Sequence, residues 1–123
     1  MFRKKVYDAY EHRCAVCKIQ LQLIEAAHII PHSHEKGTDE INNGISLCAL
    51  HHTAYDSSLI YFTKDYDVKI NEKKMDYLTK LGLDSGLHTF KKIQNDKLFL
   101  PKNHILQPSR ENIEIANRVR GIE

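Results

Sequence analysis

The sequence lacks the features of membrane and secreted proteins. No apolar run approaches the roughly 18 residues that a membrane-spanning helix requires, and no apolar stretch follows the charged residues 1–6, as it would in a secretory signal. The chain has 3 cysteines, an odd number that does not favour a disulfide framework. We therefore expect a cytoplasmic protein that does not associate with membranes.

Internal repeats and low-complexity segments are also missing, and the composition is that of an ordinary globular protein. Hydrophobic residues make up 41% and charged residues 28% of the 123 residues, a length that suits one domain with a modest core. The net charge of +2 permits nucleic-acid binding but does not by itself argue for it. We expect a single domain over residues 1–123, with a core at about 2–70 and an extension at about 71–123.

Hydrophobic periodicity and turn residues predict a mixed α+β fold. Helices are expected at residues 2–12, 49–57, 72–81 and from Ser109, a fair N-cap, through Arg120. Strand-like segments are expected at residues 21–30, 59–62, 67–70 and 98–100. The polar segment 32–43 is expected to form a loop.

All three cysteines belong to pairs with the spacing of metal ligands. Cys14-x-x-Cys17 and Cys48-x-x-His51 each allow a knuckle turn to direct two side chains at one ion, and tetrahedral Zn²⁺ accepts thiolate and imidazole. A structural zinc site would stabilise a small domain, whereas the alternative is three buried cysteines that act as small hydrophobes. The two matched pairs favour zinc. Because His51 and His52 are adjacent, the sequence leaves open which of them binds it.

A second group of residues has the chemistry of a phosphodiester-hydrolysing site. Neutral imidazole at His28 can activate water near physiological pH. His52 and Asp56 are four residues apart, so one helix face can present both to a divalent cation, which would stabilise charge developing on the phosphate. The amide of Asn43 can bond a loop backbone and a ring nitrogen at once, and would hold the base in place.

These segments resemble the His-Asn-His (HNH) endonuclease family. The resemblance is carried by Glu-Ala-Ala-His-Ile-Ile-Pro at 25–31, by Asn-Gly-Ile-Ser-Leu-Cys-Ala-Leu-His-His at 43–52, and by Tyr-Asp at 55–56. It is strong over about residues 2–70, and most similar to the branch found at the C-terminal ends of bacterial restriction endonucleases. It implies a ββα-metal (His-Me finger) core, with two strands, a loop and a helix around one catalytic ion.

The resemblance also implies a role for each matching residue. His28 would be the general base, Asn43 the motif asparagine, and His52 the second motif histidine and a ligand of the catalytic ion, which would be Mg²⁺ or another divalent cation. Asp56 would bind the same ion. The zinc set found in many family members corresponds here to Cys14, Cys17, Cys48 and His51.

One position departs from the family pattern. Many members place an acidic residue or a histidine immediately before the first motif histidine, as a metal ligand, and this chain has Ala27 there. Strand alternation puts Glu25 on the same side as Ala27, so Glu25 is either a substitute ligand or a surface carboxylate. Mg²⁺ tolerates few protein ligands because it keeps several waters and takes oxygens from the phosphate.

The sequence therefore predicts a metal-dependent endonuclease that cleaves duplex DNA, in restriction of foreign DNA. The expected partners are duplex DNA and either a second copy of the chain or an additional recognition domain. Two alternatives are a non-catalytic, zinc-stabilised DNA-binding module and a toxin-like nuclease. The intact set of His28, Asn43 and His52 favours the enzyme over the module.

Overall fold

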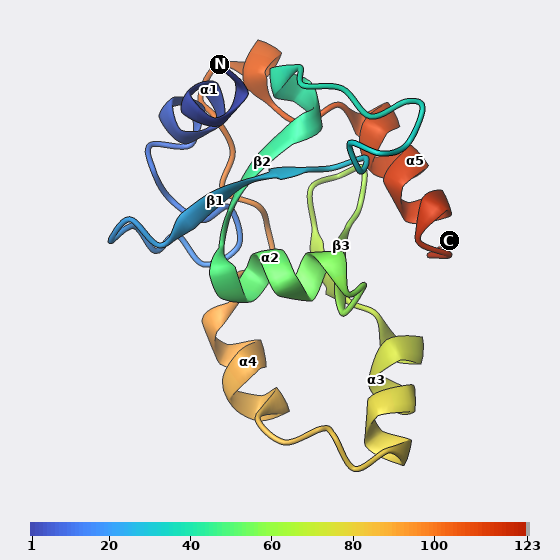
Figure 1. The fold of residues 1–123 in the computed structure, drawn as a ribbon. Helices are drawn as coiled ribbons and strands as arrows, with labels where there is room; N and C mark the ends of the chain where they lie inside the picture. Colours follow the sequence, from blue (N-terminus) through green and yellow to red (C-terminus); the bar gives the residue numbers. More distant parts are fainter. Residues whose placement is uncertain (123) are drawn as a thin grey trace.

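The fold is an α+β arrangement of helices and two antiparallel pairs of strands (Figure 1). The computed structural model describes residues 1–122. Its elements in chain order are α1 (Phe2–Ala9), β1 (Ile24–His28), η1 (Ile41–Asn43), β2 (Gly44–Cys48), α2 (Ala49–Asp56), β3 (Ile60–Phe62), β4 (Val68–Ile70), α3 (Glu72–Lys80), α4 (Leu87–Ile93), η2 (His104–Leu106) and α5 (Arg110–Val119). Strand β1 pairs with β2, and β3 with β4. The predicted α+β class is confirmed.

The strands β1 and β2 lie between α1 and α2, which contact them from opposite sides (Figure 1). His28 is paired with Gly44 in the register of the two strands, and α2 begins immediately after β2. Because side chains alternate across a strand, β1 presents His28 to Phe2 of α1 and Glu25 to His52 of α2. The expected strand–loop–strand–helix order around the site is therefore present.

The close approach of α1 to the strands depends on the small residue at the start of β2. A Cβ atom at Gly44 would lie 2.6 Å from Val6 Cγ2 and 2.9 Å from Phe2 Cε1. Val6 is fully buried, so it cannot swing into solvent to make room. The glycine thus lets α1 bring Phe2 to the end of β1.

We expect Gly44→Ala to destabilise the protein by about 1–3 kcal/mol, because overpacking a filled core forces side chains or backbone to shift. Urea unfolding followed by circular dichroism measures the change. The same substitution in a Val6→Ala background should be less destabilising, since the clashing methyl group is gone. Equal losses in both backgrounds would contradict the steric explanation.

The last helix, α5, completes the core beside β3. Asn117 Nδ2 donates to the Phe62 carbonyl at 2.8 Å, and Arg120 Nη1 donates to the Ile29 carbonyl at 3.2 Å. The Arg120 guanidinium also lies over the ring of Tyr55, 3.9 Å from its centroid. These contacts tie the C-terminal helix to the residue that follows β1 and to α2.

Two predicted elements are shorter than expected. The N-terminal helix ends at Ala9 rather than at residue 12, because Glu11 has a φ of 55°, in the left-handed region that an α-helix does not continue through. The first strand begins at Ile24 rather than at Leu21, since Leu21 has a φ of 56°. The predicted N-cap of the last helix is confirmed: Ser109 Oγ accepts a hydrogen bond from a backbone N–H at 3.2 Å.

The strand predicted at residues 98–100 is wrong. Leu98 N donates to the Tyr66 carbonyl at 2.9 Å, whereas Phe99 N donates to the Ala15 carbonyl at 2.8 Å. Adjacent residues therefore bond to two different parts of the chain, and no ladder with a single partner strand forms. Within residues 1–122, none of the helices has the length and apolar character needed to cross a membrane.

Candidate active site and metal centre

Three thiols and one imidazole converge beneath α2. The ligand atoms of Cys14, Cys17, Cys48 and His51 all lie within 4.8 Å of one another. His51 Nδ1 is 3.8 Å from Cys14 Sγ and 3.3 Å from Cys48 Sγ, and Cys17 Sγ is 3.9 Å from Cys48 Sγ. With Zn–S bonds of about 2.3 Å, two ligands of a tetrahedral ion are separated by about 3.8 Å. The four residues can therefore hold a metal such as zinc.

The environment of His51 supports a metal at this cluster. Its side chain is fully buried, Nδ1 faces thiols, and Nε2 has no hydrogen-bond partner in the described part of the chain. The ring packs against Phe90 of α4, with the ring centroids 5.6 Å apart. A buried imidazole is costly unless its polar atoms find a partner, and here the sulfur atoms are the polar neighbours of Nδ1.

The three thiols do not ionise equally. Hydrogen bonding from Cys48 lowers the pKa of Cys14, whereas the same contact together with burial raises the pKa of Cys48 to about 11. Cys48 is thus protonated at neutral pH when no metal is bound. Because a metal binds the thiolate, binding at this cluster must release the Cys48 proton, and metal affinity should rise with pH.

His52 faces a different set of groups from its neighbour. Its Nδ1 lies 2.6 Å from Glu25 Oε1 on β1, and its Nε2 lies 3.3 Å from Asp56 Oδ2 one helical turn along α2. Both carboxylates are exposed. The structure thus brings together the predicted pair of His52 and Asp56, adds Glu25 at the opposite ring nitrogen, and separates His52 from the cysteine cluster.

Asn43 is fully buried at the base of the loop between β1 and β2. Its Oδ1 accepts from Ile30 N at 2.8 Å, and its Nδ2 donates to the Ile30 and Thr38 carbonyls at 3.1 and 2.9 Å. The expected bonds to loop backbone are therefore present. Within residues 1–122, the amide makes no bond to a ring nitrogen, contrary to expectation. Its hydrogen bonds go instead to backbone groups of Ile30 and Thr38.

The ring of His28 is held by two side chains that the sequence analysis did not assign to the site. Phe2 stacks on it with the ring centroids 4.4 Å apart and an angle of 4° between the planes. Asp39 Oδ1 lies 2.9 Å from His28 Nε2 and 3.4 Å from His32 Nε2. This contact with His28 holds the pKa of Asp39 below its usual value. Periodicity could not reveal either partner, because each arrives from a segment outside β1.

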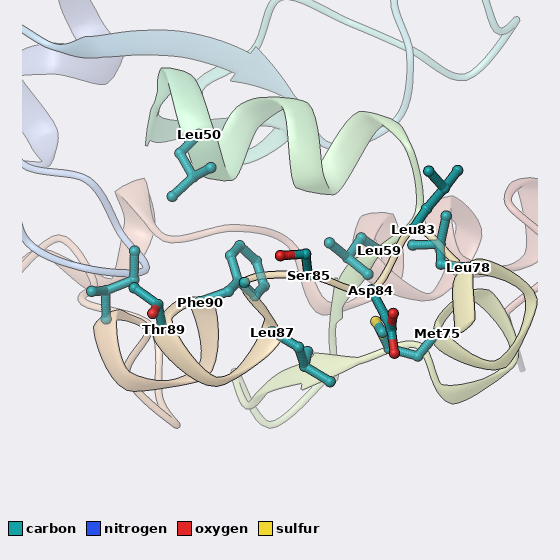
Figure 2. Close-up of a pocket in the computed structure, with 12 residues that line it drawn as sticks. Leu50, Leu59, Met75, Leu78, Leu83, Asp84, Ser85, Leu87, Thr89 and Phe90 are labelled. Atoms are coloured by element: carbon teal, nitrogen blue, oxygen red, sulfur yellow. The ribbon is translucent and has the colours of Figure 1, made fainter. Parts of the chain in front are cut away.

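An apolar pocket of about 490 Å³ lies between α2, α3 and α4 (Figure 2). Leu50, Leu87 and Phe90 line it, and none of the predicted catalytic residues does. Helix α4, which no sequence pattern predicted, forms one wall, and it has no fully buried residue of its own. The pocket is therefore separate from His28 and from His52.

Comparison with known proteins agrees with this arrangement. Residues 14–63 match a family model described as HNH endonuclease. A solved structure described as "Modification dependent TagI restriction endonuclease" is similar with a TM-score of 0.67 and 20% sequence identity, over 96% of this chain and 36% of that one. This likeness shows a shared fold, and the chain spans about a third of that protein. No curated protein matches the sequence.

The ββα order and the cluster of three cysteines and one histidine define a small α+β domain with a candidate metal centre. The match over residues 14–63 indicates the family to which this segment is similar, the HNH endonucleases. The family match and the shared fold support a nuclease function.

Proposed function

We propose that this protein is a metal-dependent endonuclease that hydrolyses phosphodiester bonds in duplex DNA. The observation that carries the proposal is the separation of the adjacent histidines: His51 faces the cysteines, while His52 faces Asp56 and Glu25. One histidine is thus available for a structural zinc ion and the other for a catalytic divalent cation, Mg²⁺ or Mn²⁺. The likeness to a restriction endonuclease supports a role in restriction of foreign DNA.

In this proposal His52 and Asp56 hold the catalytic ion. Their nearest ligand atoms are 3.3 Å apart, close to the roughly 3 Å that separates neighbouring ligands of an octahedral Mg²⁺ with bonds of about 2.1 Å. When bound, such an ion stabilises negative charge on the phosphate and on the leaving oxygen. Two protein ligands suffice, because Mg²⁺ commonly keeps several waters.

Glu25 is better suited to orient His52 than to replace the ligand missing at Ala27. It contacts Nδ1, whereas Asp56 contacts Nε2, and the two nitrogens of an imidazole point away from each other. A carboxylate that accepts a hydrogen bond from the second nitrogen of a metal-binding histidine fixes its tautomer and ring orientation. We therefore propose Glu25 as the carboxylate that orients His52.

His28 is the proposed general base. Its side chain is 25% exposed, so water can reach the ring, while Phe2 covers one face. Neutral imidazole can accept the proton of an attacking water near physiological pH. Asn43 contributes by holding the loop that follows β1 through Ile30 and Thr38.

We expect the native protein to nick supercoiled plasmid DNA when Mg²⁺ or Mn²⁺ is present and not when the ion is chelated. His28→Ala should lower the cleavage rate by about 10²–10⁴-fold, the usual contribution of a general base, with an unchanged melting temperature. His12→Ala, which removes an exposed imidazole three residues after α1, is the matched control and should cleave normally. Gel-based plasmid nicking measures all three proteins.

Failure of the native protein to cleave DNA with any of several divalent ions would overturn the proposal. DNA binding without cleavage would instead support the non-catalytic DNA-binding module. A His28→Ala variant as active as the native protein would leave the nuclease in place but reject His28 as its base.

A further inference from the structure

We propose that Asp39 is a positioning residue that orients the ring of His28 and selects its tautomer. The inference rests on the proposed function, in which His28 is the general base. It adds a residue to which neither the family match nor the sequence analysis gives a role. The observation behind it is the 2.9 Å contact between Asp39 Oδ1 and His28 Nε2.

The His28 ring is restrained in two complementary directions. Stacking on Phe2 fixes the plane of the ring, with centroids 4.4 Å apart and planes 4° from parallel. Stacking leaves rotation within that plane free, and the Asp39 contact at Nε2 removes it. Of the two ring nitrogens of His28, Nε2 has a hydrogen-bond partner and Nδ1 has none within residues 1–122. Nδ1 is therefore free to face solvent or substrate.

The charge of Asp39 decides which nitrogen carries the proton. Its contact with His28 keeps the pKa of Asp39 low, so the side chain is a carboxylate at neutral pH, and a carboxylate only accepts hydrogen bonds. His28 Nε2 must then be the donor, and the lone pair of the neutral ring lies on Nδ1. When Nδ1 takes a proton from water, the resulting imidazolium stands next to a negative charge. A carboxylate beside a catalytic histidine does the same in serine hydrolases.

Asp39 is 61% exposed, yet the backbone on each side of it is anchored. Asn43 Nδ2 donates to the Thr38 carbonyl at 2.9 Å, and Asn43 N donates to the Glu40 carbonyl at 2.9 Å. Asn43 itself is fully buried. The buried asparagine therefore fixes the residues before and after Asp39, and through them the position of the carboxylate relative to His28.

His32 shares the same carboxylate oxygen, at 3.4 Å, and its ring is tilted by 52° to that of His28. The His32 side chain is 65% exposed and lies farther from Asp39 than His28 does. The Asp39 carboxylate can accept a hydrogen bond from His28 and from His32. The shorter contact assigns the orienting role to the pair of Asp39 and His28.

The test is a double-mutant cycle in single-turnover cleavage at saturating DNA with Mg²⁺. Asp39→Ala should slow cleavage by about 10–100-fold, the usual effect of losing a carboxylate that orients a functional histidine. In a His28→Ala background the same change should have no further effect, because Asp39 acts through His28. Glu40→Ala removes the neighbouring exposed carboxylate and is the control for loop charge, with an expected rate equal to that of the native protein.

A second readout does not depend on cleavage. In ¹⁵N-labelled native protein, the Nε2 proton of His28 should give a hydrogen-bonded, downfield signal, which Asp39→Ala should remove and Glu40→Ala should retain. Full cleavage activity in Asp39→Ala, an equal loss in both backgrounds of the cycle, or an unchanged signal would each overturn the inference. If the native protein does not cleave DNA, the proposed function fails, and the signal alone then decides whether Asp39 orients His28.

Discussion

Replacing His51 by alanine is expected to abolish zinc binding and unfold the domain, whereas replacing its neighbour His52 is expected to leave zinc and fold intact. His51 is fully buried within the cluster of three cysteines, whereas His52 lies between two exposed carboxylates. The two variants differ by one position in the chain, so each is a matched control for the other.

The expected size of the His51→Ala effect follows from how structural zinc stabilises small domains. Binding free energies of about 10–16 kcal/mol have been typical of zinc-finger peptides, and whole domains are stable by only about 5–15 kcal/mol. Loss of one ligand in four should therefore bring the melting temperature below that of the native protein by tens of degrees or remove the folding transition entirely. His52→Ala should melt like the native protein but fail to nick plasmid DNA.

Elemental analysis and thermal unfolding of both purified variants decide this prediction. Native protein and His52→Ala should contain one zinc ion per chain, and His51→Ala none. Adding a strong chelator to native protein should reproduce the His51→Ala unfolding. Zinc in neither the native protein nor His52→Ala would reject the structural site, and normal folding of His51→Ala would reject its stabilising role.

Asn43→Ala is expected to destabilise the fold and to slow cleavage, whereas Asn42→Ala is expected to do neither. The Asn43 amide makes three hydrogen bonds to backbone groups, two of them to the buried residue Ile30. A buried donor or acceptor that loses its partner costs about 1–3 kcal/mol, so a loss of about 3 kcal/mol or more is expected. Asn42 contributes its backbone carbonyl, which accepts from Ser109 N, and that group survives the substitution.

Urea unfolding and single-turnover cleavage measure the two consequences of Asn43→Ala separately. Under conditions where both proteins are fully folded, the variant should still cleave more slowly, because Asn43 also anchors the residues that flank Asp39. Asn42→Ala should stay within about 0.5 kcal/mol of the native stability, because the backbone carbonyl through which Asn42 bonds to Ser109 and Asn112 is retained. Equal stability of the two variants would contradict the role of the buried amide.

The sequence pattern predicted those parts of the site that depend on local spacing. Two residues between Cys14 and Cys17 allow a knuckle turn, and a spacing of four positions from His52 to Asp56 places both on one helix face. The structure has both features. Strand alternation also predicted that Glu25 shares a side of β1 with Ala27, and the structure shows that Glu25 contacts His52 of α2.

Other parts could not be predicted because they depend on which segments fold against each other. Phe2 and Asp39 lie far from His28 in the sequence, and only the packing of α1 and the closure of the loop bring them to its ring. Residues 98–100 have the apolar pattern of a strand, but a strand forms only when successive residues bond to the same neighbouring strand. Their backbone groups instead bond to separate segments.

By itself, the sequence determined the residue types, the pair spacing and the resemblance to the HNH endonuclease family, because metal ligation and helix periodicity act over a few neighbouring residues. Only the tertiary structure decided that His51 turns to the cysteines and His52 to Glu25 and Asp56. Adjacent residues on a helix point about 100° apart, so their directions are distinct, but which one is buried depends on how α2 packs against β1 and β2. That packing decides which of the two histidines is buried among the cysteines and which lies beside the exposed carboxylates.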